Sequence, residues 1–354
     1  MTCGQRVFVT GADGFVGRHL VSCLEQAGAE VTVLRRTRPG VRTMSAGKVR
    51  TIVGDLADTA LLEAGLQGHD MIFNLAYDGR ATAAANLAAF DAMYAASESA
   101  GVGRIVHTSS IVVYDGWPNS DIDETSSMER AGGSGYRQAK IEMERRLMTG
   151  RLPAAILQPT IVYGSGSALW TEQFLEWLSI GDVVLPMPEG HCPGIFVDDL
   201  VQALLRAATL PDLAQERFIV SGAEPFAWSR LLEGYARIVG HGGVKFVPAS
   251  ELRSGVGAEP DDDHPGETTS PALIIHATGR RLLGRGRYER LLRMVKSRLA
   301  RGGAFYPDQH LLGVFLATGR CNIQHTRERL GFEPEFDLAR GLDAIASTRG
   351  LSSR

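Results

Sequence analysis

The chain has 354 residues, of which 44% are hydrophobic and 22% charged, enough for one large or two ordinary soluble domains with a buried core. The net charge of −3 excludes a nucleic-acid binder held by overall positive charge, and no apolar run is long enough to span a membrane. The N-terminus shows no secretory signal, and the four cysteines are scattered without metal-ligand spacing. We therefore expect a reducing compartment, by default the cytoplasm.

The first half of the chain alternates predicted strands with predicted helices. A short valine-rich run, residues 6–11, ends in glycine and is followed by the amphipathic stretch 14–28 and a second strand at 30–36. A later helix is expected over 83–101, where apolar residues recur at helical spacing. Further strands are expected at 49–55, 70–77, 103–110 and 154–164. This alternation predicts an α/β fold with a doubly wound parallel sheet.

Beyond residue 165 the pattern becomes less regular. The expected elements are a helix over 170–181, a strand end and helix over 191–210, and a strand over 216–222. We therefore expect a core and a smaller, less regular cap. The predicted core is 1–165, with 195–220 returning to it, and the predicted cap is 166–194 together with 221–350.

Three glycines connect the first predicted strand to the first predicted helix. Gly11, Gly14 and Gly17 follow the strand in the spacing G-x-x-G-x-x-G. The first allows a tight turn, the second lets a pyrophosphate approach the backbone, and the third lets the helix pack against the strand. In this strand–turn–helix context the three glycines predict a dinucleotide-binding site.

Seven short motifs occur in the order seen in one enzyme family. They are VTGADGFVGRHL, VGDLAD, NLAY, SSIVVY, YRQAK, LQPTIVYGSG and FVDDLV, which together cover about residues 5–210. In these motifs the chain resembles the extended short-chain dehydrogenases/reductases, the NAD-dependent epimerase/dehydratase family, and the tail TRERLGFEPEFDLARGL is similar to that family's ending. The resemblance implies a Rossmann-type core with a C-terminal substrate cap. It also implies a substrate that, for most members, is a nucleotide-activated sugar.

The resemblance assigns catalytic roles to a tyrosine and a lysine one helical turn apart. Tyr136 would be the acid/base, and Lys140 would favour the phenolate and hydrogen-bond the nicotinamide ribose. A free phenol titrates near ~10, so it needs such a charge to act as a base at neutral pH. Ser110 would orient the substrate oxygen, because three residues separate it from Tyr114 as in the family, whereas Ser109 is expected only to bond at the strand end. The alternative for the Tyr–Lys pair is a solvated helix face.

Other residues match the family at single positions. Asn86 matches the asparagine that supports the catalytic lysine through backbone and water, although a helix-surface amide is an equal alternative. Asp55 matches the acid that accepts from the adenine amino group, and Asp58 could equally be a helix N-cap. The remaining cofactor contacts that the resemblance implies are Phe15, Val16, Leu56, Leu75, Ala76 and Pro159.

Two arginines at the end of the second predicted strand bear on the choice of dinucleotide. Relatives that prefer NAD carry an acid there to hold the ribose 2′-hydroxyl, whereas this chain has Arg35 and Arg36. A guanidinium binds a 2′-phosphate in a bidentate manner, so NADP(H) is favoured and NAD(H) stays open. The alternative is that both arginines simply face solvent in an arginine-rich chain.

The sequence departs from the family where the type of reaction is decided. Ile111 and Val112 occupy the places where 4,6-dehydratases carry an Asp–Glu pair, so dehydration is not expected. Two readings stay open, a ketoreductase with exchangeable NADPH, which the arginines favour, and an epimerase that retains NAD. The arginine that grips the nucleotide in many relatives is missing from the stretch EGHCPGIFVDDLV, residues 189–201, and His191 in that loop could contact substrate. Asp198 and Asp199 are expected to be structural acids at a helix start.

The segment 280–301 carries nine basic residues against one glutamate. It could bind a substrate diphosphate, make weak contact with an anionic membrane surface, or form a solvated helix paired with an acidic loop at 259–267. The membrane reading would suit a lipid-linked sugar or a sterol-like alcohol, as in the hydroxysteroid branch of the superfamily. A non-catalytic NADPH sensor is a further alternative, and family resemblance suggests a homodimer.

Overall fold

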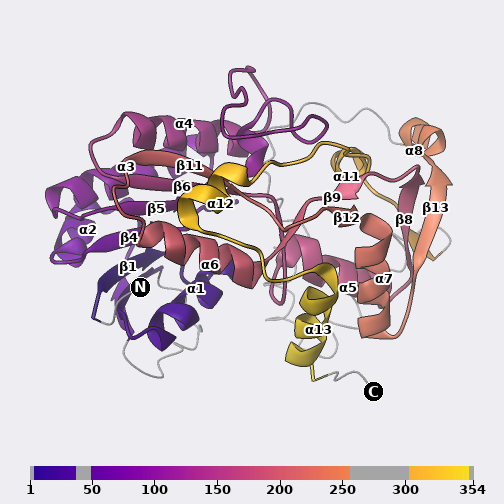
Figure 1. Cartoon of the computed structure of the whole chain (residues 1–354), viewed down its shortest axis with the longest axis horizontal. Coiled ribbons are helices and arrows are strands. Elements are labelled where there is room, and N and C mark those ends of the chain that lie inside the picture. Colours follow the sequence, from indigo (N-terminus) through magenta and orange to yellow (C-terminus); the bar gives the residue numbers. More distant parts are fainter. Residues whose placement is uncertain (1–3, 37–48, 256–302, 351–354) are drawn as a thin grey trace, which may run out of the picture.

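The computed structural model describes residues 4–36, 49–255 and 303–350. A sheet of seven parallel strands in the order β11-β6-β5-β4-β1-β2-β3 forms its centre (Figure 1). The strands are β1 (Arg6–Thr10), β2 (Glu30–Arg35), β3 (Arg50–Val53), β4 (Met71–Asn74), β5 (Ile105–Thr108), β6 (Ala154–Pro159) and β11 (Gln215–Val220). The predicted parallel sheet is confirmed.

Helices cover both faces of this sheet. Helices α1 (Phe15–Gln26) and α6 (Val197–Ala208) pack on one face, and α2 (Thr59–Leu66), α3 (Ala83–Ser99) and α4 (Gly135–Thr149) pack on the other (Figure 1). Strand β1 shows why both layers form, because Val7 and Val9 pack into the first core and Phe8 into the second, and all three are fully buried. Because successive side chains of a strand point to opposite faces of the sheet, β1 contributes to both apolar layers.

Side-chain caps fix where the site-bearing helices begin. The carboxylate of Asp58 accepts from the backbone N–H of Leu61 at 3.0 Å and caps α2, which is the capping role that the sequence left open. The hydroxyl of Ser134 accepts from the backbone N–H of Arg137 at 3.2 Å and caps α4. The start of α4 therefore sets the rotational position of Tyr136, two residues beyond the cap.

The second half of the chain builds a smaller layer beside the carboxyl edge of the sheet. Strand β8 (Asp182–Met187) lies between β13 (Val244–Pro248) and β14 (Ala304–Phe305). The shorter strands pair as β7 (Ile161–Tyr163) with β10 (Gly194–Phe196), and β9 (His191–Cys192) with β12 (Phe226–Ala227). The helices are α5 (Gln173–Leu178), α7 (Trp228–Val239), α8 (Ala249–Gly255), α11 (Gln309–Phe315), α12 (Gln324–Leu330) and α13 (Leu338–Thr348). An aromatic core around Phe174, Trp228 and Phe315 holds this layer together.

The structure differs from the predicted elements in three places. The strand expected over 154–164 is broken after Pro159. The N–H of Thr160 still donates to the carbonyl of Val220 in β11 at 3.0 Å, but the N–H of Ile161 donates to the carbonyl of Pro193 at 3.3 Å, and β7 then pairs with β10 in a different sheet. The strand expected over 103–110 ends at Thr108, before a short 3-10 turn (Ile111–Val113), and the helix expected over 170–181 begins as a π turn (Ala168–Glu172).

The segment 280–301 and the acidic loop at 259–267 lie outside the described residues. Among the helices that the structure does describe, none is both long enough and apolar enough to cross a membrane.

Candidate active site

The glycine loop forms a close-packed cradle at the start of α1. Gly11 has φ +72°, and a Cβ there would lie 2.7 Å from the carbonyl carbon of Leu75. A Cβ on Gly17 would lie 2.1 Å from the carbonyl oxygen of Gly11. Gly14 is the N-cap of α1 and offers no side chain to the first-turn N–H groups of Phe15 and Val16. The loop therefore leaves the positive end of a 12-residue helix open to an anion, as a dinucleotide pyrophosphate requires.

The other predicted cofactor residues lie at or just after the ends of further strands, at the same edge of the sheet. The N–H groups of Leu75 and Ala76, just after β4, donate to the carbonyl and the hydroxyl of Thr10, both at 3.3 Å. Pro159 is the buried last residue of β6. Asp55, after β3, is exposed, and its carboxylate accepts from the backbone N–H of Ala57 at 2.9 Å. Leu56 is half-buried beside the core of α2 and α3.

Both arginines at the end of β2 form ion pairs. Arg35 Nε lies 3.1 Å from Asp13 Oδ1, and Asp13 belongs to the glycine loop. Arg36 pairs with Asp78, in the segment between β4 and α3. Burial alone would raise the pKa of Asp78, but the hydrogen bonds from Arg36 and from the backbone of Arg80 outweigh it and hold that pKa below its usual value. Neither arginine is a simple solvent-facing cation.

Tyr136 and Lys140 lie together on α4, and the sequence predicted both. Lys140 is only 4% exposed, and its Nζ donates to the carbonyl of Thr108 at 2.7 Å. The same Nζ lies 5.8 Å from the ring centroid of Tyr136. Lys140 thereby ties α4 to the end of β5, two residues ahead of Ser110. This buried ammonium rules out a solvated helix face for the pair.

Tyr77 completes this arrangement and was not singled out by the sequence. Its ring packs edge-to-face against Tyr136, with 4.8 Å between centroids, and lies 5.3 Å from Lys140 Nζ. The ammonium therefore sits within cation–π range of two phenol rings. The sequence signals for Tyr77 are its place as the last residue of the motif NLAY and its position three residues after β4, where the carboxyl ends of the strands meet.

The two adjacent serines have different environments. Ser109 is 3% exposed and donates from its hydroxyl to the carboxylate of Glu144 at 2.5 Å. Ser110 is half-buried and caps the short 3-10 turn, its hydroxyl accepting from the N–H of Val112 at 3.4 Å. Ser109 is thus held in an internal bond, while the Ser110 oxygen accepts one long bond and its O–H can donate to a substrate oxygen.

Glu144 is the centre of a buried polar network that sequence reasoning missed. It is fully buried, and besides Ser109 its carboxylate accepts from Gln158 Nε2 at 3.0 Å and from Arg217 Nε at 2.7 Å. Gln158 in turn accepts from the hydroxyl of Tyr114 at 2.7 Å, and burial raises the pKa of that tyrosine. The network joins β5, β6, β11 and α4. The i, i+4, i+8 spacing of Tyr136, Lys140 and Glu144 is the sequence signal that could have revealed it.

In the hydrogen bonds described, Asn86 is engaged away from Lys140. It is 7% exposed, its oxygen accepts from the N–H of Asp78 at 2.8 Å, and its amide donates to the carbonyls of Asp78 and Thr82 at 3.0 and 3.1 Å. Asn86 therefore shapes the loop that carries Asp78, directly after Tyr77.

The acids at the start of α6 fasten other parts of the chain. Asp199 is buried and accepts from the N–H groups of Glu335 and Phe336 at 2.9 and 3.1 Å, and its burial raises its pKa. Asp198 accepts from His19 of α1 at 3.0 Å, and this bond raises the pKa of His19. Both acids hold the fold together. His191 is exposed on β9.

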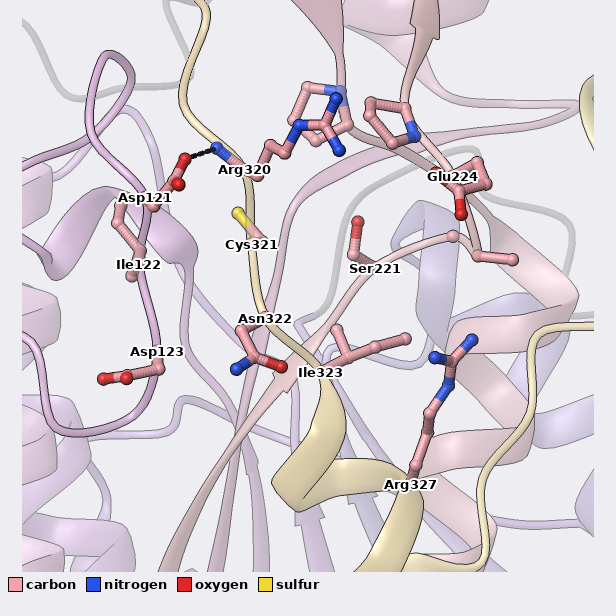
Figure 2. Close-up of a pocket in the computed structure, with 14 residues that line it drawn as sticks. Asp121, Ile122, Asp123, Ser221, Glu224, Arg320, Cys321, Asn322, Ile323 and Arg327 are labelled. Atoms are coloured by element: carbon pink, nitrogen blue, oxygen red, sulfur yellow. Dashed lines mark hydrogen bonds between the residues drawn. The ribbon is translucent and has the colours of Figure 1, made fainter.

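A pocket of about 420 Å³ opens at the carboxyl end of β11 (Figure 2). Ser221 lies near its middle, with the guanidinium groups of Arg320 and Arg327 on opposite sides. The carboxylate of Asp121 accepts from the backbone N–H of Arg320 at 2.9 Å and fixes one wall. None of the residues predicted for catalysis or cofactor binding lines this pocket.

Comparison with known proteins gives a family and several relatives. The model of the NAD dependent epimerase/dehydratase family matches residues 7–221. The chain is 29% identical over 182 residues to a 4-hydroxy-2-methyl-3-oxo-4-farnesyl-3,4-dihydroquinoline-1-oxide ketoreductase of Stigmatella aurantiaca, covering 49% of this chain and just over half, 54%, of that relative. It is 26% identical to a ceramide reductase of Caulobacter vibrioides, covering 66% and 70%. Among solved structures, UDP-glucose 4-epimerase of Thermotoga maritima aligns with a TM-score of 0.67 at 18% identity, covering 98% and 99%, and shares the fold.

Proposed function

Because the chain belongs to the NAD dependent epimerase/dehydratase family, we propose that it is an NAD(P)-dependent ketoreductase that interconverts a ketone and a secondary alcohol. The observation that carries the proposal is the pairing of Tyr136 with a buried ammonium, Lys140 Nζ, 5.8 Å from its ring centroid. The pair lies at the edge of the sheet where the glycine loop also opens. A phenol beside a buried cation is suited to exchanging a proton with an oxygen atom.

Each residue of the proposed site has one task. The bound nicotinamide supplies the hydride. Tyr136 gives its proton to the substrate oxygen in reduction and takes it in the reverse direction, and the ammonium of Lys140 favours the ionised phenol once the proton has left. The hydroxyl of Ser110 donates a hydrogen bond to the same oxygen. We propose a supporting role for Asn86, through the loop after β4.

The side chains after Ser110 argue against a dehydratase. Ile111 is 2% exposed and neither it nor Val112 can carry a proton. Elimination of water needs a group that removes a proton from carbon and another that protonates the leaving hydroxyl. Reduction needs only the Ser–Tyr–Lys set, and so reduction is the reaction we propose.

For the substrate we propose an apolar ketone, the lipid-alcohol alternative from the sequence. The segment ahead of β10 presents the fully buried Cys192 and then Pro193 where many nucleotide-sugar enzymes carry an arginine. The Tyr77 ring beside Tyr136 adds an apolar wall. The two sequence relatives named above are a ketoreductase that acts on a farnesyl-bearing ring and a ceramide reductase. The substrates in both names carry long apolar chains.

A nucleotide-activated sugar, the substrate first expected from the sequence, is the second candidate. Arg320 and Arg327 face one pocket beyond β11, and two guanidinium groups can bind a diphosphate. A UDP-sugar that competes with the ketone would favour this candidate. A homodimer and a cytoplasmic location stay predictions.

The first test is to denature the purified protein and identify any released nucleotide by mass spectrometry. A ketoreductase is expected to release little and then to bind added dinucleotide reversibly. Stoichiometric NAD would instead point to an epimerase. Next, Tyr136→Phe should lower turnover of a ketone at least about 100-fold while leaving the dinucleotide Kd unchanged. Undiminished turnover in this variant would refute the proposed proton transfer by Tyr136. If the protein instead regulated a partner, and Tyr136→Phe left that regulation unaltered, the non-catalytic NADPH sensor would be favoured.

A further inference from the structure

The two arginines at the end of β2 lie where a Rossmann core holds the adenosine ribose. Counted alone, Arg35 and Arg36 bring two positive charges to that place and favour a 2′-phosphate. Asp13 and Asp78 bring two negative charges to the same place. Among the described residues the two positive and two negative charges therefore cancel in pairs. A 2′-phosphate would find no net positive charge in these two pairs.

The two carboxylates differ in how firmly they are held. Asp78 is 27% exposed, and it also accepts from the N–H of Arg80 at 3.1 Å while its own N–H is bound by Asn86. Asp13 is 57% exposed, and its carboxylate has the ion pair with Arg35 as its described contact. Asp78 is therefore a fixed counter-charge of Arg36, and Asp13 is the carboxylate that can change partner.

The position of Asp13 puts this carboxylate on the cofactor side of Arg35. Asp13 is the residue before Gly14, which caps α1, and Arg35 is the last residue of β2, so their pair spans the two elements that a Rossmann core uses for pyrophosphate and ribose. Arg35 itself is only 16% exposed. A phosphate bound by this guanidinium would therefore have to share it with the Asp13 carboxylate.

We infer that Asp13 selects the dinucleotide. Its carboxylate accepts a hydrogen bond from the ribose 2′-hydroxyl of NAD(H), and it competes with the 2′-phosphate of NADP(H) for Arg35. The acid that NAD-preferring relatives carry at the end of β2 is thus supplied by the glycine loop. This inference rests on the proposed dinucleotide-binding function. It also implies that the two arginines alone do not predict the preferred cofactor, because nearby carboxylates compensate their charges.

The test measures binding of the adenosine half, without turnover. Adenosine 5′-monophosphate (AMP) and 2′,5′-adenosine diphosphate differ only by the 2′-phosphate, and calorimetric titration of the full chain with each gives their Kd ratio. A charge within about 4–6 Å of an ionised group typically changes that group's equilibrium by about 10- to 1,000-fold, unfavourably when the two charges are alike, and the exposure of Asp13 places the effect at the lower end. Asp13→Asn should therefore tighten 2′,5′-adenosine diphosphate about tenfold and weaken AMP a few-fold.

Two further variants sharpen the result. Asp343→Asn removes one exposed carboxylate from α13 and should leave the ratio unchanged. Arg35→Met should weaken 2′,5′-adenosine diphosphate, and in the Asp13→Asn/Arg35→Met double variant the gain should disappear, since both act on one contact. Because the Arg35→Met result is read separately, the proposal stays testable if Asp13→Asn folds poorly.

The outcomes separate this inference from the proposed function. If the chain binds NADH and NADPH but Asp13→Asn changes both adenosine ligands equally or not at all, the role of Asp13 is refuted and the ketoreductase proposal stands. If the native chain binds neither dinucleotide, both proposals fail. A tenfold tightening confined to the 2′-phosphate ligand supports both.

Discussion

Replacing Glu144 with glutamine tests how the catalytic elements are held together. The carboxylate is fully buried and accepts from Ser109, Gln158 and Arg217. Glutamine keeps the size but removes the charge, and its NH₂ group now faces donors. Removing one partner of a buried ion pair costs about 3–5 kcal/mol. Since the Arg217 side chain is 20% exposed and keeps part of its hydration, we expect about 3 kcal/mol of lost unfolding free energy.

The assay is urea unfolding at pH 7, followed by far-ultraviolet circular dichroism, with the slope m compared between variants. The matched control is Glu142→Gln on the same helix, whose carboxylate is 40% exposed and pairs with Arg145 and Arg146. A surface pair of this kind contributes about 0–1 kcal/mol. In the Glu144→Gln/Arg217→Gln double variant the loss should be smaller than the sum of the two single losses, because no unpaired charge is left. Native stability of Glu144→Gln, within about 0.5 kcal/mol, would refute the reasoning.

Three further predictions concern the glycine loop, the half-buried His19 and the ring beside Tyr136 and Lys140. Gly17→Ala should abolish dinucleotide binding because its Cβ would lie 2.1 Å from a carbonyl oxygen, whereas Gly313→Ala in α11 meets no neighbouring atom and should bind normally in the same titration. The hydrogen bond to Asp198 raises the pKa of His19 in the folded state. Protonated His19 therefore stabilises the fold fully below about pH 6.5, and this stabilisation is lost as the pH rises through the folded-state pKa. His19→Gln should remove this pH-dependent contribution. Urea midpoints at pH 6 and 8 measure it. Tyr77→Leu should lower kcat about 2- to 5-fold without changing the dinucleotide Kd, since cation–π contacts contribute about 0.5–1 kcal/mol.

Each of these has a contradicting result. Normal binding by Gly17→Ala would mean that the loop relaxes away from the carbonyl. An equal pH dependence in native and His19→Gln protein would mean that His19 contributes none of it. His69 and His107 cannot supply the expected loss, because burial lowers their pKa values and their contribution to stability therefore rises with pH. Unchanged kcat in Tyr77→Leu would leave that ring a purely structural role.

Local patterns predicted most of the sheet and the position of the catalytic helix. Strand β1 and helix α1 alternate apolar residues at periods that the sequence displays directly, and the glycine spacing is visible without a fold. The break after Pro159 was not visible, because it depends on the pairing of β7 with β10, in which Ile161 lies opposite Gly194, about 30 residues away. Periodicity reports which face of a segment is buried, but not which distant strand will pair with it.

The electrostatics of the site were harder to predict than its residues. Arg35 and Arg36 were recognised, yet their partners lie 22 and 42 positions away in other loops. A charge is read from one letter of the sequence, whereas its compensation depends on where the chain turns. Tyr77 was missed for a similar reason, since its contact with Tyr136 joins the end of a strand to a helix that starts about 60 residues later.

The late return of β11 to the sheet has a consequence for how the protein is made. All six residues of β11 pair with β6, and Arg217 brings to Glu144 a positive charge that is encoded 73 residues downstream. While the ribosome is still translating the intervening segment, the nascent sheet exposes the hydrogen-bonding edge of β6 and holds a carboxylate without its countercharge. A fragment that ends at residue 165 keeps both the exposed edge of β6 and the carboxylate without its countercharge, and we expect it to aggregate. The dinucleotide-binding half is therefore completed from the far side of the segment that interrupts it.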